Sequence, residues 1–192
     1  MEPQTLVRRY LEEAHALETA LVTTLGAHIA MTSDPDYRAL LERHLGETRD
    51  QVKALERRLR SVGGSRRGVV GIATGIVRTA VGQALVLTKG PLDLLRTPDQ
   101  RERMLKNAKD ECVTEALEIA TYDVLEAVAK AAGDRTTARL AAEHRKQEQR
   151  MLADLRAQIA ALSVETFESQ TDETAKPQAK SAATREAETV NA

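Results

Sequence analysis

The sequence predicts an all-α protein, a four-helix bundle made of two helical hairpins. The first observation is an internal repeat at an offset of 100 residues, in which Ala16-Leu17-Glu18 recurs as Ala116-Leu117-Glu118 and His44 is matched by His144. The second is composition, because the chain has one Phe and no Trp, and is rich in the helix-favouring residues Ala, Leu, Glu, Arg and Lys. The third is that apolar residues recur at helical spacing in both halves.

The first hairpin is expected to contain helices at about 5–30 and 35–62. One face of the first helix is apolar, through Leu11, Ala14, Leu21 and Leu25. The segment Thr32-Ser33-Asp34-Pro35-Asp36 has the residues of a turn and a helix N-cap, and Gly63-Gly64 ends the second helix. Because the turn is short, the two helices are expected to be antiparallel neighbours.

The second hairpin is expected to contain a helix from Pro98 or Arg101 to Ala132, and another from about Thr136 to Leu162. The turn at Gly133-Asp134 is again short. Beyond Ser163 the chain has almost no large apolar residues, so it cannot bury enough surface to offset the entropy of ordering. We therefore predict a bundle domain over 1–162 and a disordered tail over 163–192.

The segment 64–97 between the hairpins is too long for a simple loop, and one long crossover is typical of the ferritin-like arrangement of four helices. Its apolar part, 68–88, is interrupted by Arg78 and Gln83. We favour a helix packed across the bundle. The alternatives are a helix that docks to a surface or partner and a membrane span, although a central Arg costs roughly 2.5–3.5 kcal/mol in a bilayer.

Composition also argues against several functions. The net charge of −1 provides no bulk attraction to nucleic acid, and no aromatic residues are interleaved with basic ones to stack bases. The single cysteine, Cys112, cannot form an internal disulfide, which is typical of a reducing compartment. Glu2 and Arg8 interrupt any apolar run at the start of the chain, so we expect no signal peptide and a cytoplasmic location.

Acids and histidines lie on helix faces that are otherwise apolar. Glu18 falls within the apolar row of the first helix. His44 is on the inner face of the second helix, with Glu47 near the border of that face. In the fourth helix His144 and Glu148 are four residues apart on one face, which is suitable geometry for two ligands of one cation.

The third helix brings Glu115 and Glu118, of which the pattern predicts one to point inward without distinguishing them. A single histidine on an apolar face is more often a hydrogen-bonded core residue than a ligand, so a metal-free polar network is the alternative. Two histidines would leave an excess of negative charge in a dry core, whereas divalent ions would neutralise it. Carboxylates with histidine suit iron or manganese, and zinc less well.

Three segments carry a resemblance to a known family: Tyr10–Glu18, His44–Val52 and Glu115–Tyr122. They resemble the YciE/YciF family of ferritin-like proteins, over about 5–62 and 104–162. The resemblance implies a ferritin-like bundle, a di-metal centre and a role in stress response.

This sequence also departs from the usual ferritin-like pattern of Glu-x-x-His on the second and fourth helices. The second helix has the reverse order, His44-x-x-Glu47, and the fourth has His144-x-x-Gln147 followed by Glu148. A single-metal or asymmetric site is therefore an alternative to a complete di-iron or di-manganese centre.

Two functional hypotheses follow from the sequence. The first is a metal-binding stress protein, which would oxidise ferrous iron or consume peroxide if its site holds redox-active iron; no residue is assigned as catalytic. Its candidate ligands are Glu18, His44, Glu47, Glu115, Glu118, His144 and Glu148. The second is a non-catalytic helical scaffold that docks to a membrane or a partner protein through 68–88. We also expect a homo-oligomer, with the crossover as a candidate interface.

Overall fold

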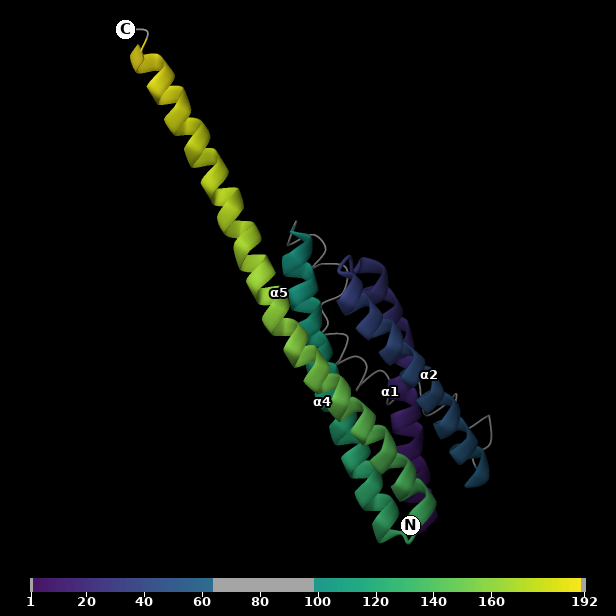
Figure 1. Cartoon of the computed structure of the whole chain (residues 1–192). Helices are drawn as coiled ribbons and strands as arrows, with labels where there is room; N and C mark the ends of the chain where they lie inside the picture. Colours follow the sequence, from purple (N-terminus) through teal and green to yellow (C-terminus); the bar gives the residue numbers. More distant parts are fainter. Residues whose placement is uncertain (1, 64–98, 191–192) are drawn as a thin grey trace.

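The computed structural model describes residues 2–63 and 99–190, with side chains described up to 171. It contains the helices α1 (Pro3–Met31), α2 (Pro35–Ser61), α4 (Gln100–Ala131) and α5 (Arg135–Val190), and no strand lies within these ranges. The helices form two antiparallel hairpins, α1–α2 and α4–α5, that pack into one bundle (Figure 1). The predicted all-α four-helix bundle is confirmed.

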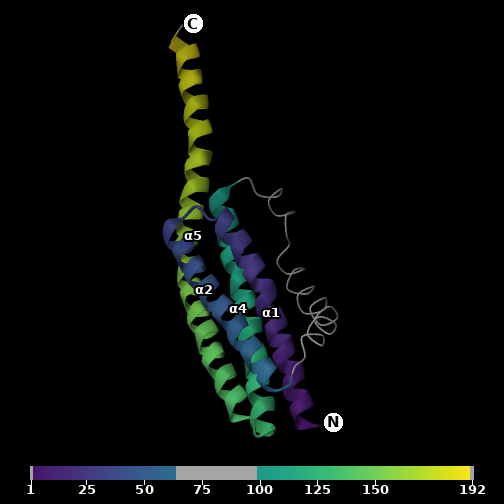
Figure 2. The same cartoon turned by 90° about the vertical axis from the view of Figure 1, so that its right-hand side faces the viewer.

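The order of the helices around the bundle determines which side chains can meet. α1 packs against α2 and α4, and α5 packs against α4 and α2 (Figure 2). The contact between α4 and α5 is the most extensive of these, and that between α2 and α5 is the smallest. Because α2 and α4 face each other across a diagonal, their side chains can meet only near the bundle axis.

The core consists of two apolar clusters separated by a polar layer. One cluster surrounds the α1–α2 turn and includes Leu25, Tyr37, Leu41, Met104 and Leu155. The other lies toward the opposite end and includes Val7, Leu11, Leu55, Tyr122 and Leu125. Between them the helices bury acids and histidines, so apolar side chains exclude water from this layer on both sides.

The fourth helix was predicted to extend to about Leu162. In the structure the backbone of α5 extends from Arg135 to Val190. Among the side chains described up to 171, Leu162 and Thr166 are the last buried ones of α5, whereas Val164 and Phe167 are exposed. The continuation of the α5 backbone extends away from the bundle (Figures 1 and 2).

Predictions for the crossover 64–97, including its apolar segment 68–88, fall outside the described residues. None of the helices in the described ranges is both long and apolar enough to cross a bilayer.

The repeat extends to the helix caps. The Asp34 carboxylate accepts a hydrogen bond from the Tyr37 backbone N–H at 2.7 Å, and Asp134 accepts one from Thr137 at 3.0 Å. Both aspartates therefore satisfy a free donor in the first turn of a helix. Asp134 alone also receives two hydrogen bonds from Nη2 of Arg58, at 2.6 and 2.7 Å, which join α2 to the α4–α5 turn.

Because only Asp134 also binds Arg58, removing the two caps is predicted to lower the free energy of unfolding by unequal amounts. Asp34→Ala should lower the free energy of unfolding by about 1 kcal/mol, the usual contribution of a cap. Asp134→Ala should cost about 2–4 kcal/mol, because charge-assisted bonds to Arg58 are lost as well. Urea unfolding followed by circular dichroism measures both values. Equal losses would show that the Arg58 contact contributes nothing.

Candidate metal centre

One face of α4 places a row of acids along the bundle axis. Glu111, Glu115 and Glu118 follow one another at spacings of four and three residues, which keeps them on one side of the helix. The sequence predicted that either Glu115 or Glu118 points inward, and the structure buries both completely, at 0% exposure. The same row continues through Tyr122 and Leu125. The spacing of these residues along the whole helix was the signal that could have predicted an inward direction for both acids.

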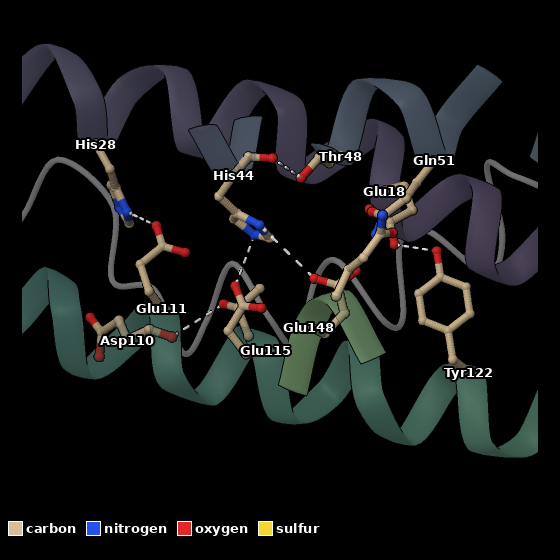
Figure 3. Close-up of polar contacts among 12 residues, drawn as sticks. Glu18, His28, His44, Thr48, Gln51, Asp110, Glu111, Glu115, Tyr122 and Glu148 are labelled. Atoms are coloured by element: carbon tan, nitrogen blue, oxygen red, sulfur yellow. Dashed lines mark hydrogen bonds and ion pairs between the residues drawn. The ribbon is translucent and has the colours of Figure 1, made fainter. Parts of the chain in front are cut away.

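Four of the predicted residues form a compact cluster in the polar layer. They are His44 of α2, Glu115 and Glu118 of α4, and Glu148 of α5, and each offers a ligand atom within 4.8 Å of all the others. Figure 3 shows His44, Glu115 and Glu148 of this cluster. Nε2 of His44 is 3.0 Å from Oε1 of Glu115, and Nδ1 is 4.0 Å from Oε2 of Glu148. Three helices therefore direct one nitrogen and three carboxylates at a common point.

Glu18 and His144 meet a different partner, the phenol of Tyr122. The Tyr122 hydroxyl donates a hydrogen bond to Oε1 of Glu18 at 2.5 Å, and Nδ1 of His144 lies 3.1 Å from the same hydroxyl. The Tyr122 and His144 rings pack edge to face, with centroids 5.2 Å apart. His144 is thus linked to Glu18 through Tyr122 and is not one of the four clustered residues.

Glu47 lies at the edge of the site. It is half-buried and lines a pocket of about 220 Å³ between α2 and α5, together with His44 and Met151. It is not among the four clustered residues. Its place on the border of the inner face, one turn from His44, matches the sequence-based expectation.

Most of the clustered oxygens lack a hydrogen-bond donor other than a neighbouring carboxyl group. In the described parts of the chain, no other group donates a hydrogen bond to either oxygen of Glu115 or Glu118, or to Oε2 of Glu148. The approach of His44 to Glu115 is close but lacks hydrogen-bond geometry. A buried carboxylate without a hydrogen-bond donor costs free energy. This set of ligand atoms therefore fits a cation, which would bind several of the oxygens at once.

A family model described as "Domain of unknown function (DUF892)" matches residues 3–168. The chain belongs to the DUF892 family. The resemblance to YciE/YciF proteins predicted from the sequence is confirmed by this match and by similar solved structures.

Three solved structures share the fold of this DUF892 protein at low identity. A Xanthomonas campestris protein is 22% identical with a TM-score of 0.68, covering 89% of this chain and 99% of that one. The E. coli stress protein YciF is 18% identical with a TM-score of 0.65, covering 84% and 96%. YcfI, a putative structural protein from Rhodopseudomonas palustris, is 19% identical with a TM-score of 0.62, covering 81% and 94%. No curated protein matches the chain.

Burial and mutual repulsion keep protons on the acids of this DUF892 centre. Burial, with the nearby charge of Glu148, raises the pKa of Glu18 to about 8, and burial with the charge of Glu115 raises the pKa of Glu148 to about 8. The pKa values of Glu115 and Glu118 are raised well above the ordinary value for the same reasons. A metal ion entering the site would displace these protons.

Two residues of the polar layer were not predicted as site residues. The Gln51 side chain donates a hydrogen bond to Oε1 of Glu148 and another to Gln147 at 2.9 Å, so it orients Glu148. Glu111 pairs with His28 of α1 one turn beyond Glu115, and both side chains are buried. Gln51 continues the inner row of His44 and Thr48 at helical spacing, which was the signal for its burial.

The raised pKa values predict how the stability of the metal-free protein depends on pH. Between the unfolded value of 4.5 and the folded value of about 8, the folded chain binds more protons at Glu18 and Glu148, so stability falls as pH rises. Burial lowers the pKa of His144 from 6.5 to about 4. This histidine therefore makes stability increase with pH, but only below pH 6.5.

The melting temperature in the presence of a chelator should therefore fall between pH 6.5 and about 8. Glu148→Gln should reduce the slope, because it removes one of the titrating groups. A melting temperature that is constant or rises over this range would contradict the assignment of protonated acids to the folded state.

Proposed function

We propose that this protein binds divalent transition-metal ions in the polar layer of its bundle, with His44, Glu115, Glu118 and Glu148 as the principal ligands. The observation that carries the proposal is the convergence of these buried side chains, whose ligand atoms lie within 4.8 Å of one another. As far as the described residues extend, only neighbouring carboxyl groups offer hydrogen bonds to the oxygens of Glu115 and Glu118, and this supports it.

The donor set favours iron or manganese over zinc. One imidazole nitrogen with several carboxylate oxygens suits these metals, and a site dominated by carboxylates is less typical of zinc. Glu18 adds a fourth carboxylate next to the cluster, and two divalent ions would balance four carboxylates. We therefore propose Glu18 as a ligand of a second ion, with His144 beside it; a single-metal site is the alternative.

The neighbouring residues would hold the ligands in place. The Tyr122 hydroxyl orients Glu18 through Oε1 and leaves Oε2 without a hydrogen bond. Gln51 orients Glu148 in the same way; among the described residues, Oε2 of Glu148 receives no hydrogen bond from an N–H or hydroxyl group and lies 4.0 Å from Nδ1 of His44. The apolar clusters on both sides exclude water, which strengthens any interaction between the carboxylates and a cation.

A redox-active iron in this site would supply the chemistry of ferrous-iron oxidation or peroxide consumption. A stress-related role is part of the proposal, and it is supported by the similarity in fold to the E. coli stress protein YciF.

Metal binding should be visible as thermal stabilisation. At about 100 times the dissociation constant, a ligand adds about 2.7 kcal/mol, which corresponds to a rise of roughly 5–10 °C for a domain of this size. The measurement is the melting temperature of metal-free protein with Mn²⁺, or with Fe²⁺ under anaerobic conditions, together with the metal content of protein purified without chelator. Metal content near zero and an unchanged melting temperature would overturn the proposal.

Glu118→Gln should separate the ligand role from a purely structural one. The variant should lose the metal-induced rise in melting temperature, yet its metal-free form should be more stable than the wild type at pH 8, because it removes a buried acid whose raised pKa opposes folding. Glu126→Gln on the same helix is the control, since its oxygens already pair with Arg145 and Lys130. It should keep the metal response. A Glu118→Gln variant that responds to metal like the wild type would contradict the ligand assignment.

A further inference from the structure

A pocket leads from the surface to one residue of the cluster. It has a volume of about 220 Å³ and lies between α2 and α5, the least extensive of the main helix contacts. Its lining comprises Arg43, His44, Glu47, Arg150, Met151, Ala153 and Asp154. Because His44 lines this pocket and also belongs to the cluster, the pocket reaches the edge of the polar layer, where His44 is 2% exposed.

The lining residues differ in depth. At the mouth, Arg43 and Asp154 form an ion pair of 3.6 Å whose side chains are 61% and 57% exposed. An exposed pair of this kind is weak and opens readily. Deeper in the pocket, Glu47 is half-buried, and His44 and Met151 are buried. A carboxylate thus stands midway between the solvent and the cluster.

Glu47 is not committed to another contact. It forms no hydrogen bond and no ion pair with any side chain that the structure describes, although two arginines line the same pocket. It lies one turn from His44 along α2, on the same side of the helix.

We infer that this pocket is the entrance through which divalent cations reach the cluster, and that Glu47 is the carboxylate that takes the ion from water and transfers it to His44 and the buried glutamates. The inference rests on the proposed function. A cation that enters a dry site must exchange its water ligands for protein ligands, and a half-buried carboxylate one turn before His44 allows this exchange in steps. Glu47 and Asp154 are negatively charged, and they balance the positive charges of Arg43 and Arg150 along the route.

The test is the rate of metal loading. Metal-free full-length protein is mixed with Co²⁺ alone, and the absorbance of the bound ion is followed by stopped flow and then at equilibrium. Glu47→Gln is expected to slow loading by roughly tenfold, the lower end of the effect that charges lining a cleft have on association rates. The final stoichiometry and the spectrum should equal those of the wild type. Glu42→Gln is the matched control, because Glu42 is an exposed acid on α2 that pairs with Arg38, and it should load at the wild-type rate.

A second pair of variants tests the route without removing a charge. Ala153→Trp places a large side chain in the lining of the pocket and should slow loading at least as strongly as Glu47→Gln. Ala160→Trp, at an exposed alanine two turns further along α5, should have no effect.

The possible outcomes distinguish the proposed metal-binding function from the proposed entrance. If the wild type binds no Co²⁺ at equilibrium, the metal-binding function and the entrance both fail. If the wild type binds Co²⁺ and the Glu47→Gln and Ala153→Trp variants load at the wild-type rate, the entrance is wrong and the metal-binding function stands. A lower final stoichiometry in Glu47→Gln would make Glu47 a ligand of the resting site and would overturn its transfer role.

Discussion

The organisation of this protein depends on the burial of several carboxylates in a water-free layer at the centre of the bundle. Glu18, Glu115, Glu118 and Glu148 are each 1% exposed or less, and most of their inward oxygens have no donor within the described residues. Such a layer is stable only if protons or cations neutralise it. The apolar clusters above and below make this requirement strict, because they prevent water from taking that role.

The repeat produces two similar hairpins but an asymmetric centre. His44 and His144 occupy matching positions, yet His44 approaches Glu115 and His144 approaches Tyr122. The reason lies in the residues at the offset of 100, where Glu115 is matched by His15 and Tyr122 by Val22. The two hairpins therefore share a backbone arrangement but place different side chains next to the matching histidines. Only His44 is directed into the cluster.

The same asymmetry extends to the surface of the bundle. α2 and α5 share the least extensive main contact, and that is where the pocket beside His44 forms. At the other side of the polar layer, Tyr122 and the tightly packed α4–α5 hairpin enclose Glu18 and His144. The described pocket therefore lies beside His44, whereas Glu18 and His144 lie beside Tyr122.

The sequence by itself determined the two hairpins, the turn and N-cap residues around Asp34 and the inward direction of Glu18, His44 and Glu148, because the period of a helix decides which face is apolar. Only the tertiary structure decided that Glu115 and Glu118 are both buried, that His144 joins Tyr122 and that Glu47 lines a pocket. These facts depend on the rotation and height of each helix relative to the others. Packing between helices sets those quantities, and no repeat within one helix encodes them.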